Sequence, residues 1–310
     1  MTRRDFLAVS SVAASAPALA APATKKSTSE TLVATLFKSL TPEQKSAVTF
    51  AFDNPLRSKV DANWHIVPQK IGEFFNPDQQ AMIREIFTGL YKPDFASTVL
   101  GQLKQDAGGF ENYNIALFGE PGGKFEFVLS GRHCTMRCDG DSVEGAAFGG
   151  PIFYGHQAGP NGLEDPAHPN NVYWYQAKRA NAVFEALDGK QREVALVVKA
   201  PRAESQNKTV QIKPQAERQG LPVSDMSKDQ RKLVEKVLAD LLLPYRQRDV
   251  DEAMKLLKAR GGAESLHMSF YKGLDIGNDG VWDVWQLEGP NMVWYFRGHP
   301  HVHTWVNIQA

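Results

Sequence analysis

The sequence is poor in cysteine, has no excess charge of either sign and holds no long hydrophobic run. Two cysteines in 310 residues exclude a disulfide-rich scaffold. Lys plus Arg and Asp plus Glu both number 35, and this balance does not favour nucleic acid as a partner, because nucleic-acid binding requires a basic face. No apolar run approaches the ~20 residues that cross a bilayer, so we expect no transmembrane anchor in the mature chain.

The familiar signatures of catalysis are also missing. The sequence has no Gly-x-Ser-x-Gly nucleophile elbow, no Walker or Gly-x-Gly-x-x-Gly loop, no His-Glu-x-x-His and no Cys-x-x-Cys. Its hydrophobic fraction of 42% and charged fraction of 23% are ordinary for a globular protein. We therefore expect a folded protein whose candidate site follows no common motif.

The first twenty residues predict an export signal. Arg3 and Arg4 are followed by Phe6 and Leu7, then by an Ala-rich stretch with a small-residue cleavage pattern at 18–20. This pattern is typical of a twin-arginine signal, and an ordinary secretory signal is the alternative. The twin-arginine export machinery is thus an expected partner, and the periplasm or the extracellular space is the expected location. The predicted regions are a signal peptide at 1–20, a flexible tether at 21–30 and one domain at 31–310.

The two cysteines can be judged against this export route. It carries proteins that are already folded, so the fold should form in the reducing cytoplasm. Cys134 and Cys138 lie in or next to a segment, 125–137, that alternates like a strand. Positions four apart on a strand are separated by ~13 Å, whereas a disulfide needs Cα atoms within ~7 Å. We expect two reduced, buried thiols, with metal ligation as the alternative.

Four segments share a pattern that predicts the start of a helix. Each has an apolar residue, then Thr, Asn, Asp or Ser as the N-cap, and Gln three residues after the cap, as in a capping box. Pro occupies the first helical position in two of them. The segments are 40–45, 75–80, 187–192 and 226–231.

After each pair of predicted helices, the hydrophobic period changes to that of strands. The alternating segments are 113–118 and 125–136, and later 266–271 and 281–287. The second pair surrounds Asn278-Asp279-Gly280, a strong hairpin signal. We predict an α+β fold of two similar halves, about 31–180 and 181–310, each with helices first and an antiparallel hairpin sheet after, packed as one body. Chance recurrence of common capping chemistry is the alternative to an internal repeat.

The most informative segment for chemistry is 299–305, which holds three of the eight histidines. On a strand, His301 and His303 point to one face and lie ~6–7 Å apart at Cα. At this spacing two imidazoles can share one cation, and imidazole nitrogen is a common donor to zinc, copper, iron and nickel.

A third ligand has to come from elsewhere in the chain. His133 ends the corresponding strand of the first half, and Gly131 before it allows a close backbone approach. If the halves meet symmetrically, His133 approaches the C-terminal pair, and Cys138 and His156 are further candidate ligands. We predict a site for a divalent transition metal, zinc or copper, and a copper site would use Met136 or Cys138 as a soft ligand. Structural histidines and metal-free acid–base catalysis are the alternatives.

Several of these segments resemble one known family. The matching runs are 113–121, 127–133, 151–155 and 289–305. They are similar to the DUF3500 family of uncharacterised exported proteins, and the similarity covers most of 31–306. The resemblance implies that His133, His301 and His303 belong to one site. It implies no particular reaction.

The chain departs from the pattern of this family at three places. Arg132 stands where the first His of a Gly-His-His motif is expected, Pro300 replaces an Asn, and an acidic residue expected near Trp294 is absent. A site of the family type is therefore expected to be incomplete here, with its activity altered or lost.

These features favour an exported protein of unknown reaction with a histidine metal site, and metal-dependent hydrolysis of a small-molecule substrate is the reaction considered for it. The ion on three histidines would activate water, and Arg132 would stabilise an anionic oxygen. The alternative is a non-catalytic periplasmic protein that binds a ligand or partner through aromatic surface. Its candidate residues are Trp282, Trp285, Trp294, Tyr295, Phe296 and Trp305, together with 173–175. Aromatics at strand spacing are more often core than a ligand platform.

Overall fold

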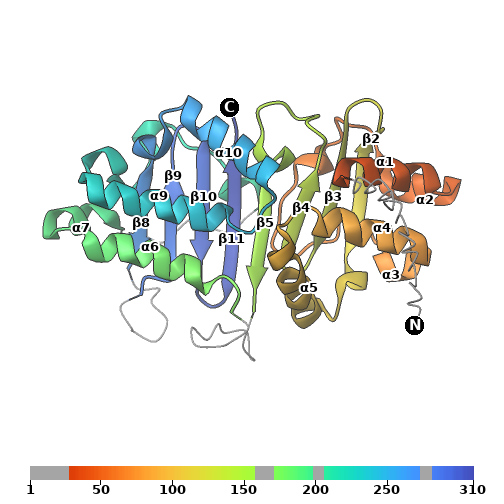
Figure 1. The fold of residues 1–310 in the computed structure, drawn as a ribbon, viewed down its shortest axis with the longest axis horizontal. Helices are drawn as coiled ribbons and strands as arrows, with labels where there is room; N and C mark the ends of the chain where they lie inside the picture. The colour runs from red at the N-terminus through yellow and green to blue at the C-terminus, as the bar shows by residue number, and fades with distance from the viewer. Residues whose placement is uncertain (1–27, 158–170, 198–205, 273–280) are drawn as a thin grey trace, which may run out of the picture.

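The computed structural model describes residues 28–157, 171–197, 206–272 and 281–310. These residues form one large, mostly antiparallel sheet with helices packed along it, which confirms the predicted α+β class (Figure 1). The predicted signal peptide and the hairpin turn at 278–280 lie outside the described residues. The first described helix begins at Ser29, so the last two residues of the predicted tether are helical.

The sheet has eleven strands in the described part of the chain, in the order β1-β2-β3-β4-β5-β11-β10-β9-β8-β6, with β7 paired to β8. The strands of the first part are β1 (Thr49–Phe50), β2 (Asn114–Gly119), β3 (Phe125–Gly131), β4 (Cys134–Cys138) and β5 (Ile152–His156). Those of the second part are β6 (Leu196–Val197), β7 (Leu221–Pro222), β8 (His267–Tyr271), β9 (Val284–Glu288), β10 (Met292–Arg297) and β11 (Val302–Ile308). The short strands β1 and β6 pair in parallel with β2 and β8, and the other pairs are antiparallel.

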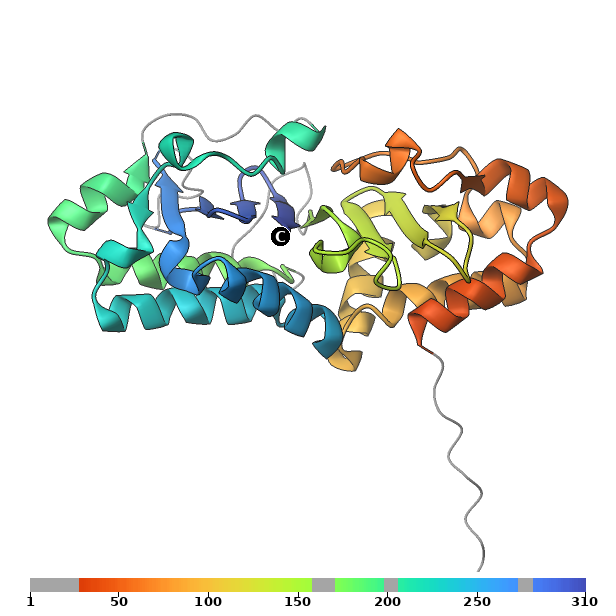
Figure 2. The same ribbon diagram turned by 90° about the horizontal axis from the view of Figure 1, so that it is seen from above.

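Helices cover one face of this sheet, as the view from above shows (Figure 2). The helices on that face are α1 (Ser29–Ser39), α4 (Pro77–Thr88), α5 (Pro93–Ala107), α6 (Trp174–Ala186), α9 (Lys228–Leu242) and α10 (Gln247–Ala259). The shorter helices are α2 (Pro42–Val48), α3 (Ile71–Phe74), α7 (Gly189–Ala195) and α8 (Gln206–Thr209). The main core lies between the sheet and the long helices, and a smaller buried cluster with Phe153, Tyr295 and Trp305 lies on the opposite face.

All four predicted helix starts are confirmed, and each is closed by a capping box. The N-caps are Thr41, Asn76, Asp188 and Ser227. The capping glutamines also pair with one another: the side-chain amides of Gln44 and Gln79 are hydrogen-bonded, and so are those of Gln191 and Gln230. One polar contact therefore joins α2 to α4 in the first part of the chain and α7 to α9 in the second. The internal repeat itself stays a prediction.

The predicted single strand over 125–137 is wrong. The segment forms two strands, β3 and β4, joined by a tight turn at Arg132 and His133. His133 adopts a left-handed backbone with φ of 58°, and the apolar alternation hides this turn because it is interrupted for only two positions. Cys134 and Cys138 both lie in β4, buried and unbonded, which confirms the expected free thiols.

Strand pairing at the centre of the sheet brings three chain segments together at one end of the strands. β5 ends at His156 and runs antiparallel to β11, which begins at Val302. β4 is antiparallel to β5 and begins at Cys134, so the β3–β4 turn lies beside the start of β11. The backbone N–H of Gly155 donates to the carbonyl of His133 at 3.1 Å, which holds this turn against β5.

Candidate metal centre

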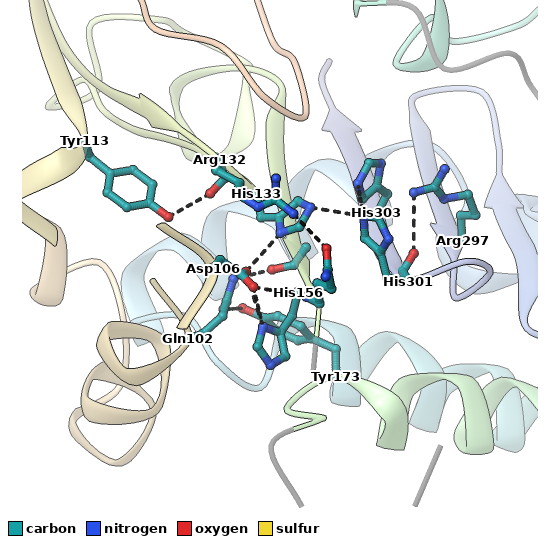
Figure 3. Close-up of polar contacts among 12 residues, drawn as sticks. Gln102, Asp106, Tyr113, Arg132, His133, His156, Tyr173, Arg297, His301 and His303 are labelled. Atoms are coloured by element: carbon teal, nitrogen blue, oxygen red, sulfur yellow. Dashed lines mark hydrogen bonds and ion pairs between the residues drawn. The ribbon is translucent and has the colours of Figure 1, made fainter. Parts of the chain in front are cut away.

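Three histidines converge at this end of the central strands (Figure 3). His133 comes from the β3–β4 turn, and His301 and His303 come from the start of β11 and the residue before it. Nε2 of His301 lies 3.2 Å from Nε2 of His133 and 3.0 Å from Nε2 of His303. The three potential ligand atoms all lie within 4.8 Å of one another. His133 is buried, and the other two histidines are partly exposed.

The spacing of these nitrogens fits a metal ion. In a tetrahedral zinc site with Zn–N bonds of ~2.0–2.1 Å, two ligand nitrogens are separated by roughly 3.3–3.4 Å. The observed separations of 3.0 and 3.2 Å are close to this value. Within the described residues, this is the group of His, Cys, Asp and Glu side chains that could hold an ion together.

Hydrogen bonding among the three rings does not account for their arrangement. A neutral imidazole nitrogen is either a donor or an acceptor. Nε2 of His301 faces two other Nε2 atoms, so it forms one good N–H···N hydrogen bond at most, and the remaining contact is unfavourable. Three lone pairs directed at one cation remove the conflict, provided that each ring carries its proton on Nδ1.

Asp106, on α5, imposes this protonation state on His133. Its Oδ2 lies 2.9 Å from Nδ1 of His133. Burial alone would raise the pKa of Asp106, but hydrogen bonds from His133 and His156 hold it well below its usual range. An ionised carboxylate only accepts hydrogen bonds, so Nδ1 is the donor and the Nε2 lone pair faces the other two rings.

The surroundings of His303 keep its ring uncharged. Burial lowers the pKa of His303 well below its usual value, and the charge of the neighbouring Arg297 lowers it further. Neutral imidazole is the form that binds metal. Arg297 is opposite His303 in the β10–β11 register, and its Nη2 donates to the carbonyl of His301 at 3.5 Å.

Arg132, predicted to stabilise an anion, precedes His133 in the turn. Its carbonyl accepts a hydrogen bond from the Tyr113 hydroxyl at 2.7 Å, and its Nη2 donates to Oε1 of Gln157 at 2.7 Å. The backbone N–H of Gln157 donates to Asp106 at 3.2 Å. The guanidinium is thus held beside the three rings through the same carboxylate that orients His133.

The further candidate ligands do not join the group. His156, at the end of β5, has its Nδ1 3.1 Å from Oδ1 of Asp106, so it shares the orienting carboxylate with His133 rather than facing the ion site. Cys138 lies at the far end of β4, where burial raises the pKa of its thiol above the usual range. Met136, the proposed soft ligand for copper, is a buried core residue.

Two residues of the site were missed in the sequence. Arg297 had a signal, because a hairpin that turns at 298–301 places it opposite His303. Asp106 had none, because its contact with the β3–β4 turn depends on how α5 packs across the sheet.

A family model described as "Protein of unknown function (DUF3500)" matches residues 23–308, a range that includes both parts of the sheet and all three histidines. No curated protein and no solved structure matches the chain. The comparisons therefore give a family and no reaction.

Proposed function

The chain belongs to the DUF3500 family, whose description names no reaction, and we propose from the site that it binds a divalent transition metal, zinc or copper. The ligands are His133, His301 and His303. The observation that carries this proposal is the convergence of three Nε2 atoms, one of them with its lone pair set by Asp106. Carboxylate-to-histidine hydrogen bonds of this kind are the usual support of metal-binding imidazoles.

With an ion bound, these residues have the composition of a hydrolytic centre. Three imidazoles leave a coordination position open, and the ion supplies a Lewis acid and an acidified water there. Arg132 is our proposed catalytic residue, since its guanidinium lies beside the rings and can stabilise negative charge on a substrate oxygen. It is also the position at which the chain departs from the Gly-His-His pattern of the family.

We also propose export by the twin-arginine machinery to the periplasm or the extracellular space. The support is the spacing of Arg3 and Arg4 ahead of an Ala-rich segment. Among the helices of the described residues, none has both the length and the apolar character needed to cross a membrane.

The test of the metal centre is elemental analysis of protein purified with its own signal and without chelators. We expect about one zinc or copper ion per chain, and a His301→Ala, His303→Ala double variant should lose it. His267→Ala, at the start of β8 and outside the group, is the matched control and should keep the metal. Equal metal content in the double variant and the wild type would refute the proposal.

The same preparation tests the alternative of a non-catalytic binding protein. Trp285, Trp294 and Trp305 are almost completely buried, so they are core residues rather than a ligand platform. Binding of sugars or peptides by metal-free protein, at the affinity of the metal-loaded form, would nevertheless favour that alternative.

A further inference from the structure

Two guanidinium groups stand on either side of the three histidines (Figure 3). Arg132 is next to His133 in the β3–β4 turn, and Arg297 is at the end of β10, opposite His303. They come from different parts of the chain, and each is next to a candidate ligand: Arg132 directly precedes His133, and Nη2 of Arg297 donates to the carbonyl of His301 at 3.5 Å.

The Arg132 side chain is fixed in place by a chain of contacts. Its Nη2 donates to Gln157, and the Gln157 backbone is bound to Asp106. The backbone of Arg132 is held from both sides, by the Tyr113 hydroxyl on its carbonyl and by a β-bridge to Asn63. Its Nε is buried and has no hydrogen-bond partner in the part of the chain that the structure describes. A donor in that state retains the capacity to bind a ligand oxygen.

The two arginines make the surroundings of the ion strongly positive, and among the described residues Asp106, which is bound to His133, offsets part of that charge. Imidazole is a neutral ligand, so three histidines leave a divalent ion with its full charge. Two guanidinium groups beside the ion add repulsion that weakens with distance but is strong at a partly buried site. An oxyanion between the ion and the guanidinium groups converts this repulsion into attraction.

We infer that the centre binds a ligand through an oxyanion group, a carboxylate or a phosphoryl group, with one oxygen on the ion and others on Arg132 and Arg297. The inference rests on the proposed metal centre and specifies the class of substrate. Guanidinium groups present paired N–H donors that match carboxylate and phosphate oxygens. Neutral groups such as simple amides or alcohols would bind more weakly, because they carry no charge to pair with the two guanidinium groups.

The experiment is calorimetric titration of zinc-loaded protein with inorganic phosphate, with acetate and with acetamide as the neutral control. We expect phosphate or acetate to bind and acetamide not to bind. The anion that binds more tightly identifies the source of the oxyanion. Arg132→Gln and Arg297→Gln should each weaken binding about tenfold or more, with zinc content unchanged. Arg179→Gln, which removes a partly exposed arginine paired with Asp240 on the helical face, should change it less than twofold.

Lysine variants separate lost charge from lost structure. Arg132→Lys and Arg297→Lys keep the charge without the paired donors, so they should bind the anion with intermediate affinity. Zinc content and thermal unfolding are measured on every sample. Zinc bound normally with equal anion affinity in wild type and both Gln variants overturns this inference and leaves the metal centre standing. Absence of zinc from the wild type overturns both.

Discussion

Two hairpin turns, one in each part of the sheet, both begin with glycine and differ in backbone conformation and chemistry, since His133 is left-handed and Asn291 is not. Their sequences are Gly131-Arg132-His133-Cys134 between β3 and β4, and Gly289-Pro290-Asn291-Met292 between β9 and β10. Each pair of neighbouring strands from β3 through β5 and β11 to β9 is antiparallel, so the two turns lie at opposite ends of the strands.

The first residue of each turn has the same packing role. A Cβ on Gly131 would overlap the ring of Tyr113, which directly precedes β2, and a Cβ on Gly289 would overlap the side chain of Leu266, which directly precedes β8. Both turns therefore need glycine so that the backbone can approach the neighbouring strand start.

The two turns differ in the contact made by their third residue. Nδ2 of Asn291 donates to the backbone carbonyl of Leu256 on α10 at 2.9 Å, a contact that ties the turn to the helix. Nδ1 of His133 makes its contact with the carboxylate of Asp106 on α5. A similar turn-to-helix contact thus anchors both turns. In the first turn the acceptor is charged and the second ring nitrogen of His133 faces the proposed metal site.

The largest expected effect comes from making the first turn like the second. His133→Asn removes one of three ligands, so zinc affinity should fall by at least about 100-fold, measured by competition with a chromophoric chelator. Asn291→Ala, in the turn at the opposite end of the strands, is the control. It should destabilise the protein by about 1–2 kcal/mol, because it leaves the Leu256 carbonyl without this donor, and leave zinc affinity unchanged. The comparison fails if the two variants bind zinc equally well.

A smaller loss is expected when the acceptor is changed and the ligands are kept. Asp106→Asn removes the negative charge that fixes the His133 proton on Nδ1, so zinc affinity should fall about 10- to 100-fold. Asp240→Asn, which changes a carboxylate on α9, is the matched control. The same titration as for the turn variants gives the result, and a fall no larger than that of the control would show that the carboxylate does not orient the ligand.

The two glycines should differ in stability rather than in chemistry. Gly131→Ala meets the rigid ring of Tyr113, and Gly289→Ala meets the end of a flexible leucine. We expect both variants to lose about 1–3 kcal/mol of unfolding free energy, with the larger loss for Gly131→Ala. Urea unfolding of the metal-free proteins measures it. An equal or reversed order would mean that Tyr113 moves aside as easily as Leu266.

The smallest expected effect is on the pH dependence of stability, at the end of the strands that carries the second turn. Carboxylates gather there instead of imidazoles. Burial raises the pKa of Glu252 on α10 to about 7, and Asp139, Asp141 and Asp249 add to it. Between the unfolded pKa and about 7, the folded protein binds more protons, so stability falls as pH rises through this window. Glu252→Gln should therefore raise the melting temperature relative to wild type more at pH 8 than at pH 5, by a few degrees at most.

The sequence predicted the local features of this fold well and the long-range ones poorly. Helix starts at Thr41, Asn76, Asp188 and Ser227 follow from short-range capping chemistry, and all four are present. The β3–β4 turn was missed because a two-residue turn without an Asn-Gly or Asp-Gly signal leaves the alternation of apolar residues nearly intact.

The candidate site was predictable in its ligands and not in its supports. His301 and His303 are two apart in sequence, so strand geometry alone places them on one face, and His133 followed from matching the two parts of the chain. Asp106 contributes through the packing of α5. Cys138 was proposed because it is close to His133 in sequence, but β4 runs away from His133 and places Cys138 at its far end. Contacts of this kind depend on tertiary packing, which hydrophobic periodicity does not encode.

The position of the histidines at the junction of β5 and β11 would also couple binding of the proposed ion to folding. His133 and His301 are 168 residues apart in the chain, so a bound ion acts as a reversible cross-link that closes a very long loop. Closing such a loop in the unfolded chain costs about 5 kcal/mol of conformational entropy. An occupied centre should therefore make the two parts of the sheet unfold together, whereas loss of the ion would leave only strand pairing and core contacts to hold them to each other.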